Sequence, residues 1–217
     1  LKIIKSTAFA VLFVLLFSFN VLSADIPLIN SENPLPQDFV PSELTEIKAT
    51  RPDGRAPQKI TNDAAVALEA LIAAMENDFA TEPPPITVTS GYRSYNYQKY
   101  LFDTAVQSYE EKGYSRAKAE ALAARYTARP GESEHQSGLC VDIHDRPCAT
   151  VDFENSPYFE WLCENAHRFG YILRYPKGKE NITKIAFEPW HWRYVGCETA
   201  KKIKKSGLCL EEYLKKY

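Results

Sequence analysis

Apolar residues recur at helical spacing between Asn62 and Phe79, in the clearest secondary-structure pattern of the chain. The apolar stripe consists of Val66, Leu68, Leu71, Ile72, Met75 and Phe79. Residues three or four positions apart share one face of a helix, so the stripe predicts an amphipathic helix. Thr61 or Asn62 is placed to cap its N-terminus.

Weaker helical patterns follow later in the chain. They cover residues 101–109, 117–126 and 157–169, and the tail 198–217 is expected to form one or two short helices. Gly170 is expected to end the third of these helices, because glycine readily adopts the left-handed conformation that commonly follows a helix.

Shorter segments have the composition or alternation typical of strands. They are Ile86–Thr89, Leu139–Ile143, Tyr171–Tyr175, Thr183–Phe187 and His191–Val195. In the second segment Cys140 and Asp142 share the face opposite Leu139, Val141 and Ile143. Helices and strands together predict a single α+β domain with a small, mainly antiparallel sheet flanked by helices.

The first 57 residues differ in composition from the rest. Two lysines, an apolar run over residues 8–19 and small residues at 23 and 24 predict a signal peptide over residues 1–24. An uncleaved membrane anchor is the alternative, although the apolar run is short for a span of about 20 residues. Residues 25–57 contain six prolines and predict an extended arm, and residues 58–217 predict the folded domain. We therefore expect a secreted or extracytoplasmic protein.

Charge and cysteine content narrow the function classes. The formal net charge of −2 provides no basic field for binding nucleic acid. Five cysteines are an odd number, so at least one cannot pair within the chain. The sequence leaves open whether Cys197–Cys209 or Cys140–Cys148 form disulfides or whether these residues are buried thiols.

The four histidines supply candidates for a metal site. Two imidazoles and one carboxylate, here His135, His191 and Asp142, are a common ligand set for catalytic zinc, with a fourth position left for water. Glu188 is the natural candidate for a general base, because a bend at Pro189 would bring it to the same metal. His144 has the same strand parity as Asp142 and is a rival ligand. The residues alone support a candidate metal site and nothing more specific.

Several long motifs occur in a fixed order. They are Ser90–Ser94 with Gln98, Pro130–Asp142, Trp161–Ala166, Phe169–Pro176, Glu188–Gly196 and Leu210–Leu214. Together they resemble the zinc peptidases that include the vancomycin-resistance D,D-carboxypeptidases and their L,D-carboxypeptidase relatives. Cys140 departs from this resemblance, since a small apolar residue is commoner at that position.

The resemblance implies roles for particular residues. Zinc would be bound by His135, Asp142 and His191, with Glu188 as the base. Arg93 would contact the scissile carbonyl and stabilise the oxyanion. The expected substrate contacts are Gln98, Ser133, Tyr175 and Trp190.

The activity implied is that of a monomeric zinc carboxypeptidase, which removes a terminal D-alanine from peptidoglycan stem peptides. D,D and L,D specificity are both left open by the sequence. A D-Ala-D-Ala dipeptidase or a wall endopeptidase is an alternative within the enzyme class. A wall-binding module without turnover is a third reading, but such a module would not need a base at Glu188.

Overall fold

The computed structural model describes residues 26–80, 86–146 and 148–217. The predicted signal peptide or anchor, residues 1–24, therefore lies outside the described residues. None of the helices in the described ranges is long and apolar enough to cross a membrane.

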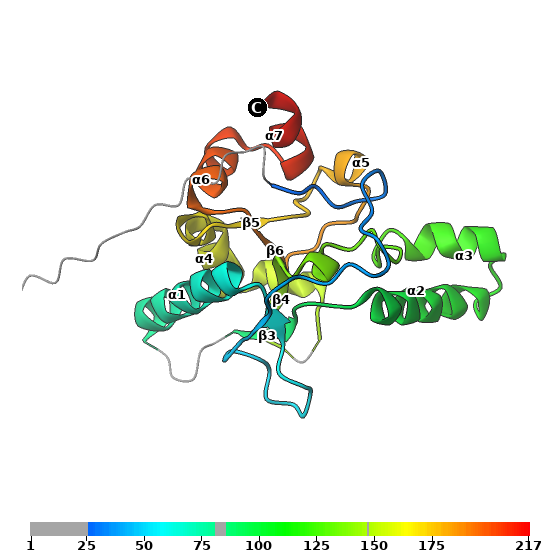
Figure 1. Cartoon of the computed structure of the whole chain (residues 1–217), viewed down its shortest axis with the longest axis horizontal. Coiled ribbons are helices and arrows are strands. Elements are labelled where there is room, and N and C mark those ends of the chain that lie inside the picture. Colours follow the sequence, from blue (N-terminus) through cyan, green and yellow to red (C-terminus); the bar gives the residue numbers. More distant parts are fainter. Residues whose placement is uncertain (1–25, 81–85, 147) are drawn as a thin grey trace, which may run out of the picture.

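A four-stranded antiparallel sheet forms the centre of the molecule (Figure 1). Its strand order is β3-β4-β6-β5, with bounds Thr87–Ser90, Cys140–His144, His191–Tyr194 and Tyr171–Leu173. Val141 and Ile143 of β4 point into the main apolar core, which also contains much of the helix predicted over Asn62–Phe79. The predicted α+β class and the antiparallel sheet are confirmed.

Helices surround this sheet at the predicted places, although the second begins earlier than predicted, the third ends earlier, and the short helix before Lys184 was not predicted. They are α1 (Asn62–Phe79), α2 (Tyr95–Glu110), α3 (Arg116–Ala123), α4 (Pro157–Asn165), α5 (Glu180–Thr183), α6 (Cys197–Ser206) and α7 (Leu210–Lys216). The predicted helix over 157–169 is α4 followed by a 3-10 turn, η4 (Ala166–Phe169), which ends at Gly170. Helices α2 and α3 lie side by side, away from α1, and have an apolar cluster of their own (Figure 1).

The predicted strand over Thr183–Phe187 is wrong. Thr183 ends the short helix α5, and Lys184 follows in the left-handed conformation, with a φ of 64°. The Thr183 hydroxyl lies within hydrogen-bond distance of the Lys179 carbonyl, one helical turn earlier. A threonine side chain can bond to the backbone carbonyl four residues earlier and so join a helical turn. The alternating pattern of residues 183–187 does not reveal this bond.

The N-terminal arm is held against the domain by hydrogen bonds. The Leu35 amide donates to the Gly131 carbonyl over 2.8 Å, and the Gln136 amide side chain donates to the Pro36 carbonyl over 2.8 Å. Further along, β1 (Thr45–Glu46) pairs with β2 (Lys59–Ile60). The arm thus contacts the loop and the 3-10 turn η2 (Glu134–Ser137), which carries His135.

Candidate metal centre

Three predicted metal ligands meet above the pair of central strands. Asp142 of β4 lies opposite His191 of β6 in the strand register. Their side chains therefore share a face of the sheet. His135 comes from η2, which closes at Gly138 and leads directly into β4.

The distances between the ligand atoms fit a small cation. Asp142 Oδ1 lies 3.3 Å from His135 Nε2 and 3.2 Å from His191 Nδ1. Ligand atoms bonded tetrahedrally to zinc at about 2.0–2.1 Å lie about 3.3–3.4 Å apart. Asp142 Oδ1 is buried and has no hydrogen-bond partner among the described residues, which is what a metal-facing oxygen requires. The three side chains thus fit zinc.

Each imidazole has a distinct orienting group on the side away from the ligand cluster. His135 Nδ1 lies 2.7 Å from the Gly91 carbonyl, which fixes Nε2 as the nitrogen free to bind metal. A Cβ on Gly91 would lie 2.5 Å from the Lys59 carbonyl, so only glycine fits at this close approach. His191 Nε2 lies 3.8 Å from Glu134 Oε2, and neither atom has a hydrogen-bond partner. A slight closure of this gap would orient His191 in the same way.

Glu188 is buried beside the same cluster, with Oε2 at 3.6 Å from His191 Nδ1. The His191 amide donates to the Glu188 carbonyl over 3.2 Å. The chain therefore turns at Pro189, as the sequence predicts, and β6 begins only at His191. Burial raises the pKa of Glu188 to about 7. The negative charge of Asp142 also raises this pKa, whereas the nearby histidines and Arg93 lower it. Such a carboxyl can exchange protons near neutral pH.

Arg93 lies at the edge of the cluster and not free in solvent. Its Nη2 contacts Asp142 Oδ2 at 2.5 Å, and its Nε donates to the Ser90 hydroxyl over 2.7 Å. Gln98 is buried and links Arg93 Nη1, at 3.4 Å, to the Ala128 carbonyl. The guanidinium is thus fixed on Asp142 Oδ2, the carboxylate oxygen that does not face the two histidines.

The other predicted substrate contacts, Ser133, Tyr175 and Trp190, are buried or half-buried. Ser133 is buried immediately before η2, and Tyr175 packs its ring at 4.8 Å from that of His191. Trp190 is half-buried and packs against the main apolar core. Tyr175 also lines a cavity of about 210 Å³ between α3 and the segment after α5. The structure therefore places the Tyr175 ring against the predicted ligand His191, whereas Trp190 packs against the core.

The rival ligand His144 is engaged elsewhere. Both of its ring nitrogens lie within hydrogen-bond distance of backbone amides, those of Arg146 and Thr150, and its ring stacks on Phe153. Its side chain is therefore occupied by the loop that follows β4.

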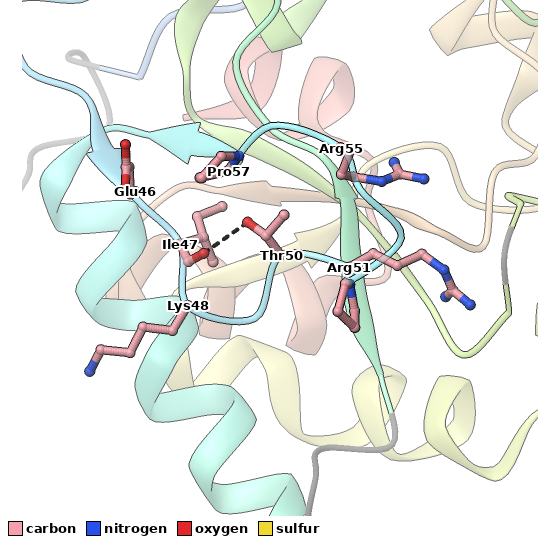
Figure 2. A pocket seen from close by; sticks show the side chains of 8 residues that line it. Glu46, Ile47, Lys48, Thr50, Arg51, Arg55 and Pro57 are labelled. Atoms are coloured by element: carbon pink, nitrogen blue, oxygen red, sulfur yellow. Dashed lines mark hydrogen bonds between the residues drawn. The ribbon is translucent and has the colours of Figure 1, made fainter.

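The loop that connects β1 to β2 lines a hollow of about 340 Å³, with three cationic side chains around it (Figure 2). Arg51 and Arg55 both pair with Asp53, and Arg55 also donates to the Thr89 carbonyl of β3. These arginines hold the loop onto the sheet. None of the predicted site residues lines this hollow.

Two features of the site were missed from the sequence. The first is Cys140. Its Sγ and one ring nitrogen each of His135 and His191 all lie within 4.8 Å of one another. Strand parity placed it beside Asp142 but gave no reason to assign it a role. All five cysteines of the chain lie in the described residues and are free thiols, so neither candidate disulfide is present.

The second is a buried network of ions behind His191. Glu134 Oε1 lies 2.8 Å from Arg174 Nε and 2.7 Å from Arg193 Nη1. Arg174 also binds both carboxylate oxygens of Glu211 on α7, at 2.6 and 2.9 Å. The C-terminal helix is thereby connected to the carboxylate that faces a metal ligand.

We expect Arg174→Met to destabilise the fold by about 3–5 kcal/mol, because it leaves Glu134 and Glu211 buried with fewer partners. Urea unfolding of zinc-loaded protein measures this. Arg116→Met is the matched control, since its pairs with Glu110 and Glu120 are exposed and worth at most about 1 kcal/mol. Equal effects of the two variants would contradict the structural role of the network.

Comparison with known proteins identifies the family. The VanY family model, described as D-alanyl-D-alanine carboxypeptidase, matches residues 57–197. A D-alanyl-D-alanine carboxypeptidase of Enterococcus faecalis is 49% identical over 127 residues, which are 58% of this chain and 46% of the relative. This chain therefore spans less than half the length of that relative.

Two solved structures resemble the whole domain. One is a variant of the vancomycin-resistance D,D-pentapeptidase VanY in complex with Zn(II), with 39% identity and a TM-score of 0.73 over 87% of this chain and 97% of that one. The other is the LD-carboxypeptidase LdcB, with 38% identity and a TM-score of 0.75 over 87% and 85% of the two chains. With its predicted ligands gathered on one face of the sheet and the family match over residues 57–197, the chain belongs to the VanY family of D-alanyl-D-alanine carboxypeptidases.

Proposed function

We propose that this protein is a zinc carboxypeptidase that removes the terminal D-alanine from peptidoglycan stem peptides outside the cytoplasmic membrane. The observation that carries the proposal is the convergence of His135, Asp142 and His191 with a buried carboxyl, Glu188, whose Oε2 lies 3.6 Å from His191 Nδ1. A module that only bound the wall would have no use for that carboxyl.

The residues divide the work of hydrolysis among them. When bound, zinc supplies Lewis-acid polarisation of the scissile carbonyl and of the attacking water. Glu188 accepts the proton of that water and delivers it to the departing amine. Arg93 places a fixed positive charge where the oxyanion develops, and Gln98 holds the guanidinium in position. Ser133, Tyr175 and Trp190 are the proposed walls of the substrate cleft.

The domain layout and location are part of the proposal. We assign residues 1–24 to a signal peptide or anchor, 25–57 to the arm and 58–217 to the catalytic domain, which acts as a monomer. The hydrogen bonds of Leu35 and Gln136 support a stabilising role of the arm at the loop that carries His135.

The test of the function is a panel of stem peptides. Purified protein is incubated with tripeptide, tetrapeptide and pentapeptide stems, and the released residue is identified by mass spectrometry. Release of one D-alanine from the pentapeptide indicates D,D specificity, and release from the tetrapeptide indicates L,D specificity. Release of a dipeptide would favour the D-Ala-D-Ala dipeptidase, and cleavage of cross-linked stems only would favour the endopeptidase. Binding without any cleavage would contradict the proposal.

We expect Arg93→Ala to lower kcat by about 10²–10³-fold, which is the usual effect of losing one oxyanion donor. Zinc content at saturating metal should stay near that of the parent protein, because Asp142 Oδ1 still faces the ion. Steady-state kinetics and metal analysis on the same sample measure both quantities. Arg55→Ala is the control, since this arginine also bonds to β3 but lies outside the cluster. An unchanged kcat in Arg93→Ala would assign Arg93 a structural role only.

A further inference from the structure

One ring nitrogen of His191 is a buried group that the proposed mechanism does not use. The other, Nδ1, faces the ligand cluster, at 3.2 Å from Asp142 Oδ1 and 3.6 Å from Glu188 Oε2. Nε2 is buried and has no hydrogen-bond partner among the described residues. A neutral imidazole that binds a metal through one nitrogen carries its proton on the other. With metal at Nδ1, Nε2 is therefore a buried N–H donor that needs an acceptor.

The atom opposite this nitrogen is a carboxylate oxygen that also lacks a partner. Glu134 Oε2 lies 3.8 Å from His191 Nε2 and is buried without a hydrogen bond. Both side chains are buried, so bulk water does not offer either atom a substitute. A closure of about 0.6 Å would bring the two atoms to about 3.2 Å, within the range of an N–H···O bond. Because an unpaired buried donor is costly, the pair has reason to close.

Glu134 is held in place through its other oxygen. Oε1 lies 2.8 Å from Arg174 Nε and 2.7 Å from Arg193 Nη1. Arg174 is in turn paired with Glu211 of α7. The two arginines and two carboxylates have a net charge of zero, so the Glu134 carboxylate is balanced without a cation at His191. Its Oε2 is thus a fixed acceptor for a neutral imidazole.

We propose that Glu134 is a positioning residue of the metal centre, which accepts the Nε2 proton of His191 and so holds Nδ1 towards the metal. This inference rests on the proposed zinc-dependent function. No ligand is added to the centre, because Glu134 contacts the ring nitrogen that does not bind metal. The fourth position therefore stays open for water.

The proposal gives the 3-10 turn η2 two tasks at the same centre. Glu134 and His135 are consecutive residues of this turn. His135 binds the metal directly, and Glu134 orients the second histidine ligand from behind. A carboxylate that accepts the remaining N–H of a metal-binding histidine fixes the ring and makes it a more basic ligand. Loss of that carboxylate should therefore weaken metal binding.

Zinc affinity separates positioning from mere support of the fold. We expect Glu134→Gln to raise the Kd for zinc by about 10–100-fold, the usual cost of changing a group that orients a ligand. A neutral amide oxygen is a weaker acceptor than a carboxylate. Competition with a chromogenic chelator measures this Kd on the full chain.

Glu211→Gln is the matched control for that variant. It makes the same chemical change in the same buried network, but Glu211 bonds to Arg174 and not to a metal ligand. Its Kd for zinc should change far less than that of Glu134→Gln. Equal losses of affinity in the two variants would show that the network only supports the fold, and would overturn the positioning role.

The proton itself can be observed in the parent protein by NMR, which decides the question even if Glu134→Gln fails to fold. The full chain is labelled with ¹⁵N-histidine and loaded with zinc, and slowly exchanging ring N–H protons are recorded. We expect one on His191 Nε2 and one on His135 Nδ1, which lies against the Gly91 carbonyl. Glu134→Gln should shift the first and leave the second unchanged as an internal control.

The outcomes keep this inference apart from the proposed function. A His191 ring proton that exchanges freely with water, or one that is found on Nδ1, would overturn the role of Glu134 while zinc binding and cleavage remain. Absence of zinc binding in the parent protein would contradict the metal centre itself, and this inference with it.

Discussion

The Glu188→Gln variant is expected to fold, to bind zinc normally and to turn over stem peptides at least about 10²-fold more slowly. An amide has nearly the shape of the carboxyl but cannot accept the proton of the attacking water. Glu188 is suited to that task because burial raises its pKa to about 7 and because it lies 3.6 Å from His191 Nδ1. Single-turnover kinetics with zinc analysis of the same sample measures the effect on turnover.

Glu132→Gln is the matched control, because Glu132 lies in the loop before His135 and is an alternative base. It should retain near-normal turnover. A pattern in which Glu132→Gln is impaired and Glu188→Gln is not would assign the base to Glu132. Loss of zinc from Glu188→Gln would make Glu188 a metal ligand.

His191→Ala is expected to lose both zinc and activity. Removing a direct ligand should lower zinc affinity by more than the roughly 10–100-fold that outer-shell changes cost. Metal content after gel filtration, measured by mass spectrometry of the eluted protein, gives the first quantity, and the stem-peptide assay gives the second.

Two other histidines serve as comparisons. His167→Ala removes an imidazole of η4, which contributes no residue to the ligand cluster, and should keep its zinc. His144→Asn tests the rival ligand and should also keep its zinc, because that ring is bonded to the loop after β4. Zinc retained by His191→Ala and lost from His144→Asn would reverse the assignment.

Local patterns predicted the elements where one physical cause dominates. The apolar stripe of α1 recurs along most of an 18-residue helix, and the predicted bounds match the observed ones, although Val66 of the stripe is exposed. The segment Thr183–Phe187 is too short for a repeating pattern to identify its secondary structure. There, hydrogen bonding by Thr183 and the left-handed conformation of Lys184 determine the conformation, and neither follows from alternation.

The sequence could nominate candidate residues for the site but not the contacts between them. Histidine and acidic residues suggest a metal, but the choice between Asp142 and His144 depends on which side chain points to His191. The pairing of Asp142 with His191 across β4 and β6 determines this. The network of Glu134, Arg174 and Glu211 joins residues far apart in the chain, so no local pattern could reveal it.

The most direct test of the account is metal titration of stem-peptide cleavage. Zinc is removed with a chelator, the chelator is washed out, and zinc is restored in steps while release of D-alanine is followed by mass spectrometry. The account predicts no release without metal and full recovery at one zinc per chain, with no recovery in His135→Ala at the same zinc concentration. Cleavage that continues without metal, or that recovers equally in His135→Ala, would contradict it.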